Sequence, residues 1–189
     1  MHNSDSTNKI LTIPNGLTLV RFVLVGVMAW FFLNNNPLAA MAIYIIAAAT
    51  DLVDGYIARR FNQISNVGKV FDPIADKLMT VTALVCMFLR GFLTPGVLTV
   101  VIIKEALMVV GGALIYFVFK KVVYANLYGK ISAAAYFLAI MLLFLHEYVQ
   151  PYDAWFMYLA VAMNVISMLQ YGYINIVMEY RKKKKESLD

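Results

Sequence analysis

The chain has 189 residues, of which 62% are hydrophobic and 14% are charged, and its mean hydropathy is +0.73. This composition excludes an ordinary soluble domain, because such domains are about 45–50% apolar and about 25% charged. The net charge of +5 comes largely from a basic run at residues 181–185, and the absence of a basic face interleaved with aromatic residues argues against nucleic-acid binding.

From its first residue onward, the chain alternates short polar segments with long apolar ones. Residues 1–13 are polar and lack the basic start and short apolar core of a cleaved signal peptide. The apolar stretches that follow have about 20 residues each, enough for a helix to cross roughly 30 Å of hydrocarbon. We predict transmembrane helices over Pro14–Leu33, Pro37–Arg59, Lys69–Leu89, Pro95–Phe119, Leu127–Tyr148 and Asp153–Tyr180. The expected fold is an all-α integral membrane bundle of six transmembrane helices over residues 14–180, followed by a basic tail at 181–189.

The lysines and arginines of the connections predict the orientation of these helices. Cytoplasmic connections carry an excess of Lys and Arg. One side has Lys9, the loop 59–69, Lys120, Lys121, Lys130 and the tail, whereas the loops 34–36, 90–94 and 147–152 on the other side contain only Arg90. We therefore expect a cell-membrane protein with both termini in the cytoplasm.

Four aspartates lie in the second and third predicted helices. A charged residue at the bilayer centre costs at least about 2.5 to 3.5 kcal/mol, so acids there need compensation. Asp51 and Asp54 are three residues apart and Asp72 and Asp76 are four apart, which puts each pair on one helical face. Because the connecting segment is short, the helices form a hairpin with both pairs about 10 to 12 Å from its cytoplasmic end.

Several arrangements would compensate these acids. All-oxygen ligation selects hard divalent cations such as Mg²⁺ or Mn²⁺. The acids could instead form buried ion pairs with Arg59, Arg60, Lys69 and Lys77. Transport of a cation or proton through the cluster fits the same charge pattern.

The residues around the aspartates form a recognisable motif. It reads Asp51-Leu-Val-Asp54-Gly55-Tyr-Ile-Ala58-Arg59, then eight residues, then Gly68-Lys-Val-Phe-Asp72-Pro-Ile-Ala-Asp76. The motif resembles the signature of the CDP-alcohol phosphatidyltransferase family, with every specified position matched. The opening Pro14-Asn15-Gly-Leu-Thr18-Leu-Val-Arg21 is similar to that of bacterial members. A cation path would not need Gly55, Ala58 and Arg59 at fixed spacing from the acids.

The resemblance implies transfer of a phosphatidyl group from CDP-diacylglycerol to an alcohol, with a two-metal site of Mg²⁺ or Mn²⁺. By resemblance, Asp51, Asp54 and Asp72 are metal ligands, and Asp76 completes the second metal site and is the general base for the acceptor hydroxyl. The resemblance also implies a homodimer surrounded by membrane lipids, with the active site on the cytoplasmic side.

The same resemblance implies a site for the CDP-lipid. Small side chains at Gly55 and Ala58 allow a pyrimidine or pyrophosphate to approach the helix backbone, although small residues also favour close helix packing. Arg59 can bind the pyrophosphate or extend to the membrane surface as an interfacial cation. By analogy Ser65 and Gly68 line this site, and Asn15 and Thr18 either bind the nucleotide or cap the first helix.

The acceptor is predicted less directly. In size and opening the chain is most similar to bacterial phosphatidylglycerophosphate synthases, which implies glycerol 3-phosphate as acceptor. Lys104 and Lys130 are the candidates to hold its phosphate, although Lys104 could pair with Glu105 and Lys130 could be a membrane anchor. Those synthases commonly carry Arg-Glu in the fourth helix and another Arg two turns later, where this chain has Lys104-Glu105 and Gly112. A CDP-diacylglycerol-dependent cardiolipin synthase, or a synthase using serine or inositol phosphate, therefore stays an alternative.

Overall fold

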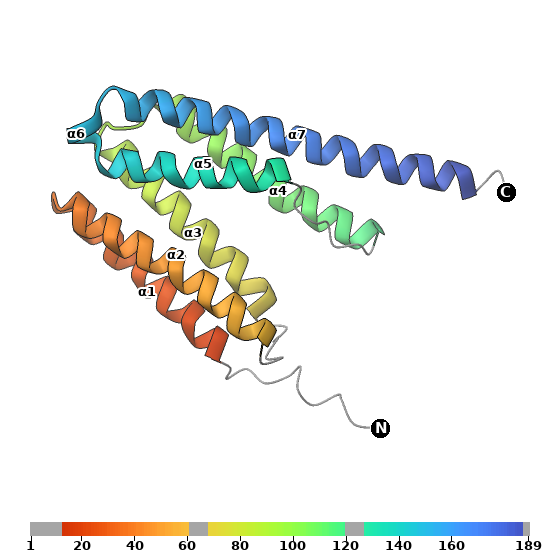
Figure 1. The fold of residues 1–189 in the computed structure, drawn as a ribbon, viewed down its shortest axis with the longest axis horizontal. Coiled ribbons are helices and arrows are strands. Elements are labelled where there is room, and N and C mark those ends of the chain that lie inside the picture. Colours follow the sequence, from red (N-terminus) through yellow and green to blue (C-terminus); the bar gives the residue numbers. More distant parts are fainter. Residues whose placement is uncertain (1–12, 61–67, 120–126, 187–189) are drawn as a thin grey trace. The chain divides into compact units, whose positions relative to one another are not determined.

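The computed structural model describes residues 13–60, 68–119 and 127–186, and within them the side chains of 16–51, 53, 74–111, 127–170, 172 and 173. These ranges form seven helices and no strand (Figure 1). The helices are α1 (Ile13–Leu33), α2 (Pro37–Arg60), α3 (Gly68–Leu89), α4 (Pro95–Phe119), α5 (Leu127–Phe144), α6 (His146–Val149) and α7 (Tyr152–Glu186). The predicted all-α class is confirmed.

The predicted starts and ends of α1 to α4 agree with the structure to within one residue. Both α2 and α4 begin at a proline, which fits the first helical position because no hydrogen bond is lost there. Before α2, the Asn36 side chain accepts a hydrogen bond from the Ala39 N–H at 3.3 Å and caps the helix.

The predicted fifth and last helices differ from the observed ones. The fifth was expected to run from Leu127 to Tyr148, but α5 ends at Phe144 and α6 follows separately. The reason is local, since the Leu145 N–H donates to the Leu142 carbonyl and closes α5 with a tighter turn. The last helix continues to Glu186.

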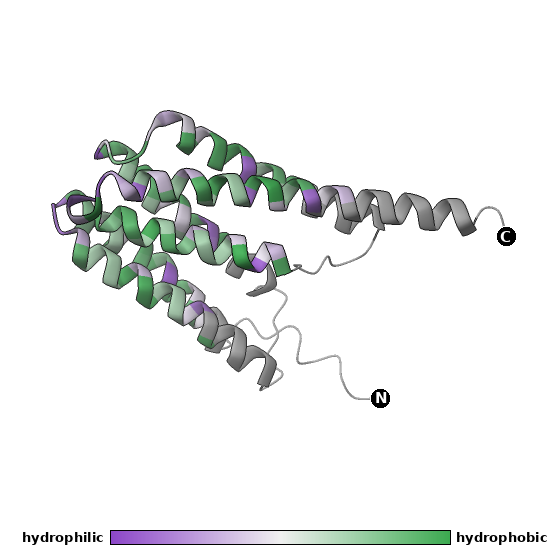
Figure 2. Ribbon diagram, turned by 45° about the horizontal axis from the view of Figure 1, so that its top comes forward, coloured by the Kyte–Doolittle hydropathy of each residue, from purple (hydrophilic) through white to green (hydrophobic). Residues whose placement is uncertain are grey.

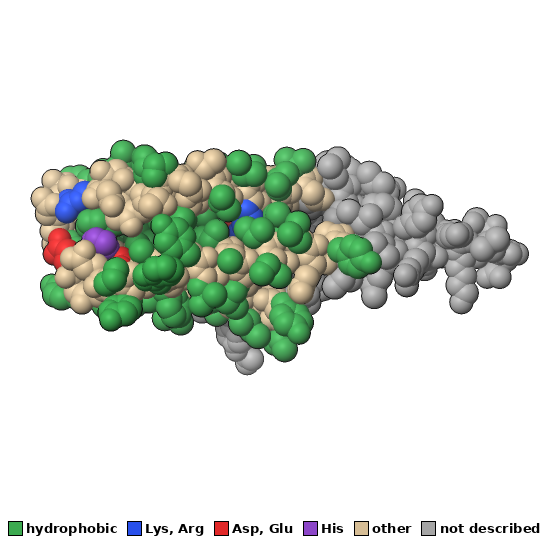
Figure 3. Space-filling model, turned by 90° about the horizontal axis from the view of Figure 1, so that it is seen from above, with side chains coloured by type: hydrophobic (Ala, Val, Ile, Leu, Met, Phe, Trp, Pro, Cys, Tyr) green, Lys and Arg blue, Asp and Glu red, His purple; other side chains and the backbone are tan. Residues whose placement is uncertain are grey.

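Long apolar helices make this an integral membrane protein. Among the described residues, three segments are long and apolar enough to cross a bilayer, namely Gly16–Leu33, Leu127–Phe144 and Tyr152–Gln170, and Pro37–Asp51 is a shorter apolar stretch. Hydrophobic residues predominate along the described helices and on the surface in view (Figures 2 and 3). The count of six spans stays a prediction.

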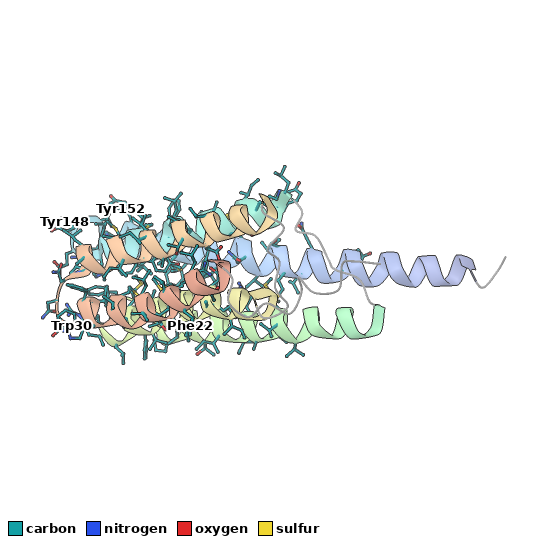
Figure 4. All side chains as sticks on the ribbon, turned by 90° about the horizontal axis from the view of Figure 1, so that it is seen from below. Phe22, Trp30, Tyr148 and Tyr152 are labelled. Atoms are coloured by element: carbon teal, nitrogen blue, oxygen red, sulfur yellow. The ribbon has the colours of Figure 1, made fainter. Side chains whose placement is uncertain are left out.

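Exposed aromatic residues lie near several helix ends. Trp30 is in the last turn of α1, and Tyr148 and Tyr152 flank the turn between α6 and α7 (Figure 4). All three side chains are well exposed. Amphipathic rings of this kind are enriched where the ends of membrane helices meet the lipid headgroups.

The described helices fall into two compact units that divide between Phe92 and Leu93. In the first unit, α1 packs against both α2 and α3. The buried positions of α1 recur every three or four residues, as one helical face requires, and are Thr18, Arg21, Val25, Met28 and Phe32. On α2 the buried positions are Ala40, Tyr44 and Ala47. Two of these three side chains are methyl groups, which allows close approach of the neighbouring helices.

A side-chain hydrogen bond connects the two turns at one end of this unit. Asn35 has a positive φ of 62°, a conformation that asparagine tolerates. Its side chain accepts a hydrogen bond from Arg90, which follows α3. The Arg90 guanidinium also lies 5.7 Å from the centroid of the Phe92 ring. The buried face of α1 therefore runs from an apolar end near this turn to a polar end at Arg21 and Thr18.

In the second unit, α7 packs against α5 and also contacts α4 and α6. Its apolar core includes Ile140 and Leu143 of α5 and Met157 of α7. At the start of α7, the fully buried Asp153 places Oδ2 2.5 Å from Nδ1 of His146. This contact joins α6 to the first turn of α7.

Candidate active site

Asp51 lies on α2 one turn after the buried Ala47, so it continues the face that packs inside the first unit. Its Oδ1 is 2.7 Å from Nη1 of Arg21 on α1. The Arg21 side chain is 2% exposed, whereas the Asp51 side chain is 41% exposed. The guanidinium is therefore enclosed, and the carboxylate keeps an open side that a ligand can reach.

Arg21 was not among the cations proposed from the sequence as partners of the acids. The sequence does contain a signal for it, because a charged residue inside an apolar span requires a partner or an aqueous cavity. Arg21 is such a residue, and it lies one turn from Thr18, which is also buried. Of the predicted partners Arg59, Arg60, Lys69 and Lys77, only Lys77 has a described side chain.

Asp76 lies on the exposed side of α3, one turn before Thr80. Thr80 is hydrogen-bonded to the buried Tyr44 of α2, and the Asp76 carboxyl group lies near the Tyr44 hydroxyl. Because α2 and α3 run in opposite directions (Figure 1), this bond places Tyr44 and Thr80 at a similar depth. Counting about 1.5 Å per residue from it, Asp51 and Asp76 differ in depth by about 4 to 5 Å. That offset is compatible with a shared site.

The other residues proposed for the metal and CDP-lipid sites lie outside the described side chains. They are Asn15, Asp54, Gly55, Ala58, Arg59, Ser65, Gly68 and Asp72. Consequently, the described side chains include no group of three His, Cys, Asp or Glu residues that could hold a metal. Asp51 and Asp76 both offer carboxylate oxygens with exposed surface, and this donor set fits a hard divalent cation.

Lys104, a candidate for the acceptor phosphate, lies in the second unit and is only 5% exposed. Its Nζ is 2.5 Å from Oε1 of Glu105 and donates a longer hydrogen bond of 3.4 Å to Oδ1 of Asn164 on α7. It also lies 5.6 Å from the centroid of the Tyr136 ring. The pairing with Glu105 is therefore present, and Lys104 contacts residues of α4, α5 and α7.

Asn164 is a second residue that the sequence reading missed. Its Nδ2 donates to the Ser132 carbonyl on α5 at 2.9 Å, so one amide joins α5, α7 and Lys104 of α4. An asparagine within an apolar stretch of helix was the available signal, because such residues often hydrogen-bond between transmembrane helices. Lys130, the other acceptor candidate, is exposed in the first turn of α5.

Comparison with known proteins agrees with the motif. The family model described as CDP-alcohol phosphatidyltransferase matches residues 11–166. A Bacillus subtilis protein named CDP-diacylglycerol–glycerol-3-phosphate 3-phosphatidyltransferase is 34% identical over 182 residues, covering 86% of this chain and 94% of that protein. A protein of the same name from Aquifex aeolicus is 30% identical, covering 65% of this chain and 69% of its own length.

A third relative carries a different name. A Streptomyces coelicolor protein named cardiolipin synthase (CMP-forming) is 34% identical over 110 residues, covering 55% of this chain and 51% of that protein. The family model matches most of the chain, and this match does not depend on which acceptor a relative's name implies. The chain therefore belongs to the CDP-alcohol phosphatidyltransferase family and is a membrane-embedded transferase.

Proposed function

We propose that the protein transfers the phosphatidyl group of CDP-diacylglycerol to glycerol 3-phosphate, giving phosphatidylglycerophosphate and CMP for phospholipid biosynthesis. The observation that carries this proposal is the similarity to the Bacillus subtilis relative, which extends over 94% of a protein whose name states both substrates. The complete signature from Asp51 to Asp76 supports the CDP-lipid as donor.

The chemistry proposed for the acidic cluster follows from the donor set. Asp51, Asp54 and Asp72, with Asp76, would hold Mg²⁺ or Mn²⁺ at the cytoplasmic end of α2 and α3. Bound divalent ions would neutralise negative charge on the phosphate oxygens and on the leaving CMP. Asp76 takes the proton of the acceptor hydroxyl, whose oxygen forms the new bond to phosphorus as the bond to CMP breaks.

The CDP headgroup is proposed to lie against Gly55, Ala58 and Arg59, with Ser65 and Gly68 nearby and Asn15 and Thr18 on α1. Thr18 is buried on the same face as Arg21, so it lies on the side of α1 that packs within the unit. The diglyceride tails stay in the lipid while the headgroup enters from the cytoplasmic side. By family resemblance we expect a homodimer in the cell membrane, with both termini in the cytoplasm.

The acceptor phosphate is proposed to bind Lys104 and Lys130. Replacing Lys104 by Gln is expected to raise the KM for glycerol 3-phosphate about tenfold or more, because a hydrogen bond to a charged group contributes about 1.5 to 3 kcal/mol. The KM for CDP-diacylglycerol should stay nearly unchanged. Steady-state kinetics in mixed micelles measure both values, with Lys184→Gln in the basic tail as the matched control. Unchanged values for both substrates would leave Lys104 as a structural partner of Glu105 and Asn164.

A second acceptor is supported by Gly112, which stands where related synthases commonly have an arginine, and by the Streptomyces coelicolor relative named cardiolipin synthase. Phosphatidylglycerol carries one negative charge and an uncharged attacking glycerol, so a pocket with fewer cations would bind it.

The lipid product separates the two acceptors. Purified protein is incubated with labelled CDP-diacylglycerol and with glycerol 3-phosphate, phosphatidylglycerol, serine or inositol phosphate, and the products are resolved by chromatography and mass spectrometry. We expect phosphatidylglycerophosphate from glycerol 3-phosphate. If cardiolipin forms from phosphatidylglycerol and no product forms from glycerol 3-phosphate, the assignment of glycerol 3-phosphate as acceptor is wrong. The proposed metal chemistry would be unaffected by that result.

A further inference from the structure

We infer that Arg21 is a positioning residue for the metal site, because its enclosed guanidinium holds the Asp51 carboxylate by one oxygen and leaves the other for a divalent cation. The inference rests on the proposed function, since it concerns a carboxylate proposed there as a metal ligand. Arg21 itself cannot bind the cation, because its guanidinium has hydrogen-bond donors and no lone pair to offer a metal.

The position of Arg21 differs from that of an arginine that merely anchors a helix. An anchoring arginine extends its charged group towards the membrane surface. Arg21 is instead 1% exposed and lies on the buried face of α1 between Thr18 and Val25. Burying a charge is unfavourable unless it is paired, so this placement is expected only where the arginine has a specific partner. Asp51 is such a partner, at 2.7 Å.

The geometry of the pair leaves room for a metal. An ionised carboxylate has two oxygens and about four lone-pair directions, and Arg21 contacts Oδ1. With 41% of its surface exposed, the Asp51 side chain is only partly covered by this contact. Because α1 also packs against α2 and α3 through Val25, Met28 and Phe32, the guanidinium is carried by a fixed helix face. A carboxylate held in this way has one preferred orientation before any cation binds.

Positioning can be separated from two other roles of the ion pair. If Arg21 mainly competed with the cation for Asp51, removing its positive charge would tighten metal binding, because like charges repel. If Arg21 only stabilised the fold, the folded variant would bind metal as the wild type does. Positioning alone predicts weaker metal binding by a folded variant.

Mn²⁺ binding to the full-length protein in detergent tests these alternatives, with the electron paramagnetic resonance signal of free Mn²⁺ as the readout. Partners that orient a metal ligand typically contribute 10- to 100-fold to metal affinity, and we expect a loss of roughly this size for Arg21→Met. Arg21→Lys keeps the positive charge but lacks the planar guanidinium, so its Mn²⁺ affinity should lie between those of the wild type and Arg21→Met. Arg90→Met, which removes the arginine bonded to Asn35 in the same unit, should bind Mn²⁺ like the wild type.

A double-mutant cycle tests whether Arg21 acts through Asp51. In an Asp51→Asn background, Arg21→Met should cause little further loss of Mn²⁺ affinity, since the oriented ligand is already gone. In the transfer assay, Arg21→Lys should raise the Mn²⁺ concentration that gives half-maximal rate by a larger factor than it raises the KM for CDP-diacylglycerol.

The outcomes are distinguishable. If the wild type binds Mn²⁺ and both Arg21→Met and Arg21→Lys bind it equally well or more tightly, the positioning role of Arg21 is wrong. The proposed metal site is not affected by that result. Absence of Mn²⁺ binding by the wild type would instead overturn the proposed metal site. Should Arg21→Met not fold, as judged by its elution profile and thermal unfolding, Arg21→Lys decides by the same criteria.

Discussion

Replacing Asp51 by Asn is expected to abolish phosphatidyl transfer, with a loss of at least about 100-fold, because a direct ligand should matter no less than the groups that orient it. The substitution removes a charged ligand from the proposed metal site, and it also removes the counter-charge of the buried Arg21. Asp54→Asn and Asp72→Asn should have the same effect on transfer. Radiolabelled product formation in saturating Mg²⁺ or Mn²⁺ measures the loss.

The matched control is Glu147→Gln, which neutralises an exposed acid in α6 and should retain the wild-type rate. The wild type should also lose activity in excess chelator and regain it when the metal is restored. Sustained turnover in chelator, or a wild-type rate for any of the three aspartate variants, contradicts the proposed metal site.

Replacing Asp76 by Asn should separate chemistry from binding. Loss of a general base typically lowers a rate by about 10² to 10⁴, and we expect a drop of that order in kcat. Affinity for the CDP-lipid should remain measurable, since Asp51, Asp54 and Asp72 would still organise at least one cation. Equilibrium binding of CDP-diacylglycerol in the presence of metal, together with single-turnover transfer, gives the two values for each protein.

The two ways in which this prediction can fail are informative. If Asp76→Asn loses binding and turnover in equal measure, Asp76 is mainly a metal ligand. If its turnover equals that of the wild type, Asp76 has no part in the mechanism. Thr80 lies one turn after Asp76 on α3, and its hydroxyl is hydrogen-bonded to Tyr44 of α2. The Thr80→Val variant removes this hydroxyl and therefore serves as the control for changes in the packing of α2 against α3.

The sequence alone determined the class of fold and most helix limits. Apolar length and the prolines at 37 and 95 predicted α1 to α4 to within a residue, because both signals act locally along the chain. The spacing of Asp51, Asp54, Asp72 and Asp76 also predicted which acids share a helix face, since that depends only on helix geometry. Family membership followed from the same motif. The break at Leu145 was missed because no glycine or proline marks it.

Only the tertiary structure decided which faces meet. The contacts of Arg21 with Asp51 and of Lys104 with Asn164 join residues that are far apart in sequence, on different helices. In a membrane helix, apolar residues occur on lipid-facing and buried sides alike, so hydrophobic periodicity does not reveal which side packs inward. The rotation of α1 that encloses Arg21 is set by packing against α2 and α3. A charged residue within an apolar span thus indicates from the sequence that a partner exists, and the packing of the helices determines which residue that partner is.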